Sequence, residues 1–197
     1  MSLELVNAIA SVFTAVVIGA TAVAAIIQLR HLRMNNQITA LLAVQAEFDA
    51  KDFREAERLV RKEFPAILED EGFCAYFIAV LKDEEPVESS RYVGARYAAR
   101  IVANTYENLG VLAKRGIVDR NILLDVYAYI ITSAWDDLEG FVALVRLLTG
   151  EQTLYINFEY LASIARDEPT SKLSPYPRQA KRLTPHIPKA AAKLLNA

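Results

Sequence analysis

The sequence predicts an all-α protein: a single N-terminal transmembrane helix that continues into a stalk and a cytoplasmic helical bundle, followed by a Pro-rich basic C-terminal tail. Three observations predict this class. The first thirty residues contain a long uncharged apolar run. The apolar residues that follow recur with helical rather than alternating spacing. Gly116, Gly150 and Pro65 lie at the ends of the helical patterns, and no Gly or Pro forms a hairpin dipeptide.

The predicted anchor covers residues 1–30. No charged residue lies between Glu4 and Arg30. As a helix, Leu5 to Leu29 would measure roughly 38 Å, against about 30 Å of bilayer hydrocarbon. A cleaved signal peptide is the alternative, because Ala22-Val23-Ala24 resembles a cleavage site. A signal peptide has a basic start and a shorter apolar run, whereas no Lys or Arg precedes this one. The pattern therefore favours an uncleaved anchor.

The cations near the span predict its orientation. Arg30 and Arg33 follow the apolar run and no cation precedes it, so the positive-inside rule places the N-terminus outside and the rest of the chain in the cytoplasm. The lone Cys74 fits a reducing compartment. We therefore expect a single-pass protein of the plasma (inner) membrane.

Small residues recur every four positions within the span, at Ser11, Ala15 and Gly19. Such a ridge lets a second helix approach closely in lipid. It is a candidate contact with an integral membrane partner or with a second copy of the chain. The alternative is an Ala-rich span whose small residues face lipid.

The predicted cytoplasmic helical domain covers residues 31–168. Its stalk carries one apolar stripe, formed by Ile38, Leu41, Leu42, Gln45 and Phe48. Asp52 and Glu55 form a capping pattern for the next helix, and Pro65 marks where that helix stops or kinks. A shorter helix over 71–81 then leads into an acidic loop over 82–90.

The helix that begins at Ser89 or Ser90 is predicted to be central, because it has apolar residues on two sides. Gly116 is predicted to end this helix as a left-handed C-cap, and Asp119 is predicted to cap the start of the next helix. The first side holds Ala98, Ile101, Val102, Thr105, Leu109 and Leu112; the second holds Ala95, Ala99, Ala103 and Gly110.

Three further helices are predicted after Asp119, over residues 120–132, 134–148 and 152–166. Gly150 ends the second of them and Pro169 follows the third. In this division Asp136 and Asp137 lie at a helix start, where they would stabilise the macrodipole rather than act as a catalytic pair. Trp135 and most tyrosines are expected in the core or at its rim.

No arrangement of residues predicts a metal, a cofactor or a reaction. His31 lies beside the span and His186 in the tail, and neither has a Glu three residues before it, as a di-iron bundle requires. Gly110 and Gly116 suggest the two glycines of a phosphate loop, but Ile117 and Val118 stand where its Lys and Ser/Thr are needed. Carboxylates that a hydrolase could use are Glu107, Asp136, Asp137, Glu139 and Glu159.

The predicted tail, residues 169–197, holds five of the seven prolines and six cations but no acid. Residues 1–168 carry 16 basic and 24 acidic residues, a net charge of -8. The tail can therefore bind anionic lipid or an acidic protein surface, and no specific nucleic-acid binding is expected. Its candidate contact residues are Tyr176, Arg178, Lys181, Arg182 and Ile187.

Several short motifs resemble those of a known family. They are Tyr106-Glu107-Asn108-Leu109-Gly110, Gly116-Ile117-Val118-Asp119, Trp135, Arg146 and Asn157-Phe158-Glu159-Tyr160-Leu161. In this order, after a span and a polar stalk, they are similar to the bacterial membrane-anchored helical proteins called domain of unknown function 4760. The resemblance covers roughly residues 5 to 165 and implies one span plus a cytoplasmic helical domain. It carries no assigned reaction, and the tail lies outside it.

The sequence therefore favours a membrane-anchored interaction module, an accessory or scaffolding subunit of a larger membrane complex. A membrane-tethered effector or enzyme in stress or phage defence is the alternative. It would need a polar pocket, and no sequence motif predicts one. A ligand-sensing helical domain is a third reading.

Overall fold

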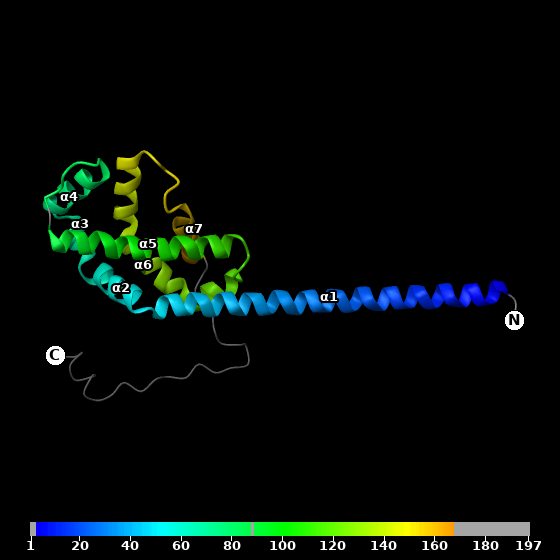
Figure 1. The fold of residues 1–197 in the computed structure, drawn as a ribbon. Coiled ribbons are helices and arrows are strands. Elements are labelled where there is room, and N and C mark those ends of the chain that lie inside the picture. Colours follow the sequence, from blue (N-terminus) through cyan, green and yellow to red (C-terminus); the bar gives the residue numbers. More distant parts are fainter. Residues whose placement is uncertain (1–2, 88, 168–197) are drawn as a thin grey trace, which may run out of the picture. The chain divides into compact units, whose positions relative to one another are not determined.

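The computed structural model describes residues 3–87 and 89–167, and all regular secondary structure in that part of the chain is helical (Figure 1). There are seven helices in these ranges. The fold class predicted from the apolar spacing is confirmed in this respect.

Helix α1, Leu3–Asp49, is a single helix of 47 residues. It contains no proline, and its only glycine is Gly19, so nothing interrupts the hydrogen-bond ladder between the apolar half and the polar half. The predicted continuation of the apolar helix into a stalk is therefore confirmed. The predicted stripe is partly wrong: Leu41 and Phe48 are half-buried, but Ile38 and Leu42 are 53% and 59% exposed, and the buried Val44 lies outside the stripe.

Helices α2, Lys51–Lys62, and α3, Phe64–Leu68, meet at Glu63, and Pro65 lies in the first turn of α3. The predicted helix boundary at Pro65 is therefore confirmed, with a new helix starting there. The predicted cap at Asp52 is wrong. Ala50 is the N-cap of α2, and its methyl side chain cannot accept a hydrogen bond. Asp52 already lies within the helix, because only Ala50 separates α2 from α1.

Helix α4, Glu71–Leu81, has the predicted bounds. Asp70 caps it by accepting a hydrogen bond from the Gly72 amide at 2.8 Å. The second carboxylate oxygen of Asp70 accepts a bond from the Tyr92 hydroxyl at 3.1 Å. One side chain therefore starts α4 and also ties it to α5.

Helix α5, Ser90–Lys114, contacts α2, α3, α4, α6 and α7, which confirms its predicted central place. Its buried face contains the whole second predicted stripe, part of the first (Ala98, Val102 and Leu109) and also Tyr106, whereas Ile101, Thr105 and Leu112 are only half-buried. Ser89 occupies the N-cap but makes no side-chain bond to the helix, so the expected serine cap is not formed. Gly116 has a φ of +65°, which confirms the left-handed turn after the helix.

Helix α6, Arg120–Thr149, is one helix of 30 residues, so the predicted division near residue 133 is wrong. No Gly or Pro lies between 120 and 139, and the Thr132 hydroxyl bonds back to the Ala128 and Tyr129 carbonyl oxygens instead of capping a new helix. Gly150, with a φ of +72°, ends α6 as predicted.

Helix α7, Ile156–Asp167, begins four residues later than predicted. Residues 152–155 form turns, and Tyr155 has a φ of +58°. The tail prediction concerns residues outside the described part of the chain.

Aromatic side chains form much of the core. Phe64, Phe73, Phe77 and Phe141 contact one another under α3, α4 and α6, with ring centroids between 5.5 and 5.8 Å apart. A second group surrounds Tyr106 and consists of Phe48, Phe53, Phe158 and Trp135. The second group joins the end of α1 to α5 and α7.

Candidate functional site

The apolar half of α1 is the most exposed hydrophobic surface of the described chain. Its most apolar 18-residue stretch is not buried against any other element, and Phe13 and Ile18 are 70% and 64% exposed. It is the one helix of the described residues that is long and apolar enough to cross a membrane. The Thr14 and Thr21 hydroxyls donate to the carbonyl oxygens of Ala10 and Val17 at 2.9 and 2.8 Å, so both are satisfied within the helix.

The predicted small-residue ridge lies on this uncovered surface. Ser11 and Ala15 help to line a shallow hollow along α1. Gly19 lies outside the hollow, and a Cβ atom added there would meet no atom within 4 Å. The three residues are thus accessible, and no described part of the chain packs on them.

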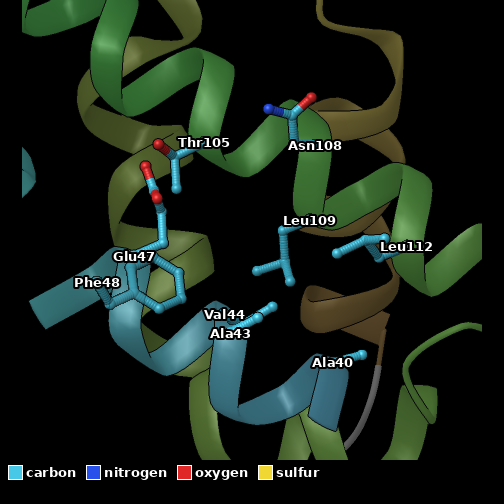
Figure 2. A pocket seen from close by; sticks show the side chains of 9 residues that line it. All are labelled: Ala40, Ala43, Val44, Glu47, Phe48, Thr105, Asn108, Leu109 and Leu112. Atoms are coloured by element: carbon cyan, nitrogen blue, oxygen red, sulfur yellow. The ribbon is translucent and has the colours of Figure 1, made fainter. Parts of the chain in front are cut away.

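A second exposed feature is a pocket of about 380 Å³ between the stalk part of α1 and helix α5 (Figure 2). Glu47 and Thr105 lie together at one end of the pocket, and Ala40 and Leu112 lie at the other (Figure 2). Val44 and Leu109 form its centre. The two helices therefore run antiparallel along the pocket. The full lining is Ala40, Ala43, Val44, Glu47, Phe48, Thr105, Asn108, Leu109 and Leu112.

The pocket closes at Phe48, which holds the stalk to the rest of the fold. The Phe48 ring lies 5.0 Å from that of Phe53, 5.6 Å from that of Tyr106 and 5.1 Å from that of Tyr127. The end of α1 therefore packs against three helices, α2, α5 and α6.

The chemistry of the pocket is mainly apolar. Glu47, Thr105 and Asn108 supply its polar groups, and their side chains make no hydrogen bond or ion pair within the described residues. Pockets of this size and character hold small ligands in many proteins. Here the polar groups lie at the rim, without the paired acid and base that catalysis needs.

Helices α5 and α7 are joined at a polar and close-packed junction. Glu107 accepts three hydrogen bonds: from the Asn157 and Phe158 amides at 2.9 and 2.8 Å, and from the Asn157 side-chain amide at 2.7 Å. The carboxylate thus satisfies the first amides of α7, in place of a cap from α7's own sequence. Gly110, one turn later, packs against the Asn157 backbone.

The same junction contains stacked rings and an ion pair. Tyr106 stacks on Phe158 with centroids 5.0 Å apart. Arg146 of α6 donates to the Leu154 carbonyl oxygen at 2.8 Å and pairs with Glu159 at 2.7 Å. Burial raises the pKa of Tyr106 well above its usual value, and its hydroxyl has no partner among the described residues.

A comparison with known families finds a match that covers most of the chain. The sequence model of the family described as Domain of unknown function (DUF4760) matches residues 15–164. The chain belongs to this family. No curated protein and no solved structure matches it.

In this DUF4760 protein, the motif residues named above meet in space although they lie 50 positions apart. Tyr106, Glu107 and Gly110 of α5 face Asn157 and Phe158 of α7, and each contact serves capping or packing. The sequence points to Glu107 only as one of several carboxylates. Its capping role appears once α7 is placed beside it.

The other acidic candidates of the DUF4760 chain lie along α6. Asp136 pairs with Arg166 of α7, so the expectation that it supports a helix start is wrong, because α6 is continuous there. Partial burial raises the pKa of Asp137, opposed by Arg61. Glu139 is exposed. These carboxylates do not converge on one cleft.

The metal and thiol candidates are also dispersed. Within the described residues, no group of three or more His, Cys, Asp or Glu side chains has the arrangement of a metal site. His31 is exposed on α1, and Cys74 is only partly buried and donates to the Leu68 carbonyl oxygen at 3.3 Å. The tail candidates, Tyr176, Arg178, Lys181, Arg182 and Ile187, lie outside the described part of the chain.

Proposed function

We propose that the protein is a membrane-anchored helical interaction module that serves as an accessory or scaffolding subunit of a larger membrane complex. The observation that carries this proposal is α1. Its apolar half is uncovered, and it continues without a break into a stalk that three helices grip at Phe48. A helix that is apolar on all sides and unburied needs lipid or another protein around it.

The proposed orientation places the N-terminus outside and the packed helices in the cytoplasm of a bacterial cell. Arg30 and Arg33, at the end of the apolar run, support this orientation. The continuity of α1 favours an anchor over a cleaved signal sequence, because cleavage after Ala24 would leave an apolar helix end at Ala25 to Leu29.

The first test uses single cysteines in a Cys74→Ala background, with labelling of intact cells by an impermeant maleimide. Ser2→Cys should react, whereas Gln152→Cys should react only after lysis. Alkaline carbonate should leave the protein in the membrane. The reverse labelling pattern, or release by carbonate, would contradict the proposed anchor or its orientation.

The second test asks whether the span meets a partner. Gly19→Leu adds bulk to the small-residue ridge and should weaken association by on the order of 1 kcal/mol, measured by co-purification in mild detergent. Ala20→Leu adds three carbon atoms rather than four, about 100° around the helix, and is the matched control. Purification without any stoichiometric partner or second copy would count against the scaffolding role.

A further inference from the structure

The turn between α5 and α6 lies on the side of the packed helices that faces the apolar half of α1. The two helices are antiparallel along the pocket, with Thr105 beside Glu47 and Leu112 beside Ala40 (Figure 2). Beyond Leu112, α5 therefore leads toward the N-terminal half of α1, as Figure 1 also shows. The turn over 115–119 follows at once.

Helical rise sets the height of this turn above a bilayer. Ala40 is eleven residues from Leu29, where the uncharged run ends, which corresponds to roughly 16 Å along α1. From Leu112 to Arg115, α5 advances three residues, or about 4 to 5 Å, toward the uncharged part of α1. The turn then lies roughly 12 Å from the hydrocarbon, close to a headgroup layer about 5 to 7 Å thick.

The side chains of the turn suit an anionic interface. Lys114 and Arg115 are exposed, and neither pairs with an acid in the described residues. The Lys114 ammonium lies 5.9 Å from the centre of the Tyr160 ring, a weak contact at an exposed site that it can exchange for a headgroup. Their flexible stems span the remaining distance. Ile117 is 47% exposed at the tip, where an apolar side chain gains by entering the interface. The nearby Asp119 carboxylate accepts bonds from the Asn121 and Ile122 amides.

We propose that this turn, through Lys114, Arg115 and Ile117, binds the anionic headgroups of the membrane in which α1 is anchored. Arg30 and Arg33 contribute cations from α1 at the same boundary. The turn is then a second contact with the bilayer, which restricts how the packed helices tilt about the stalk. The proposal rests on the proposed function, because it needs α1 to span.

The test uses the full chain in vesicles, with a fluorophore on a single cysteine and a quencher carried by spin-labelled lipid headgroups. Asn121→Cys, in a Cys74→Ala background, reports from the first turn of α6. Gln152→Cys reports from the turn that follows the C-terminal end of α6. In vesicles containing phosphatidylserine, the label at 121 should be quenched more than the label at 152. Phosphatidylcholine alone, or high salt, should remove that difference.

Two double variants test the role of charge. Lys114→Gln with Arg115→Gln should lower the equilibrium constant for contact between the turn and the membrane roughly thirtyfold, the scale expected for two cations at an anionic surface. Arg54→Gln with Arg58→Gln removes the same charge from exposed positions of α2 and should change nothing. Circular dichroism checks that both variants are folded.

Each outcome bears on the proposal. If carbonate releases the protein, the anchor itself fails and this inference fails with it. If the protein stays inserted but the label at 121 is quenched no more than that at 152, only the headgroup contact is overturned. Quenching that persists in Lys114→Gln with Arg115→Gln also overturns it, because recognition by charge is then absent.

Discussion

Gly110 is a residue at which α5 and α7 lie in close contact. A Cβ atom built on it would lie 2.1 Å from the Asn157 carbonyl oxygen and 2.5 Å from its carbonyl carbon. Both atoms are backbone, so no side-chain rotation relieves the contact. The requirement for glycine here comes from the neighbouring helix, since Gly110 itself is helical.

Gly110→Ala should therefore destabilise the fold by about 1 to 3 kcal/mol, the usual cost of overpacking, despite the better helix propensity of alanine. The midpoint of chemical denaturation measures the effect. Gly94→Ala on the same helix meets nothing within 4 Å and should be neutral or stabilising by up to about 1 kcal/mol. Equal stability of the two variants would contradict the close contact.

Helix α6 contains two sequence patterns that resemble a helix start, and only the first of them caps the helix. Asp119 accepts bonds from the Asn121 and Ile122 amides at 2.9 and 3.2 Å, as a cap should. Asp136 and Asp137 resemble a second start, but they lie in mid-helix. Leu123, Ile131 and Leu138 are all fully buried along one side, so packing supports a continuous helix.

Asp119→Ala should cost about 1 kcal/mol of unfolding free energy, because it leaves two amides of α6 without their acceptor. Asp52→Ala is the matched control. Asp52 fits a capping motif in sequence but does not cap α2, so its loss should cost only a few tenths of a kcal/mol through the helix dipole. A larger effect at Asp52 than at Asp119 would reverse this assignment.

At the scale of the whole molecule, the chain combines an apolar helix, an acidic set of packed helices and a basic end. Residues 1–168 carry a net charge of -8, and all six cations after Glu168 lack an acidic neighbour in sequence. The buried residues of the described part fall between Val44 and Ala165. The apolar half of α1 and the residues after α7 are therefore expected to serve contacts rather than the core.

Ending the chain after Asp167 should leave the thermal midpoint of the detergent-solubilised protein unchanged, because the described core ends at Ala165. Association with the partner complex should fall. To separate lipid from protein contacts, neutralising the tail cations is compared with Tyr176→Ala plus Ile187→Ser, and we expect the apolar pair to matter. A lowered midpoint would show that the tail belongs to the fold.

Much of the fold follows from local signals. The uncharged run between Glu4 and Arg30 predicts the long apolar helix. The predicted bounds of α4, the cap at Asp119 and the helix ends at Gly116 and Gly150 are confirmed. These features depend on residues within one or two turns of each other. Side-chain caps, φ preferences and helical periodicity act at that range, so sequence alone determines them.

Tertiary structure decided the rest. Ile38 and Leu42 share a predicted stripe with Leu41 and Phe48, yet the aromatic group around Phe48 selects which side of the stalk is covered. The capping of α7 by Glu107 joins residues 50 positions apart. The pocket is lined by residues of α1 and α5 that lie more than 55 positions apart in the sequence. Each depends on which distant surfaces meet, and that is settled by the packing of the whole core rather than by any local preference.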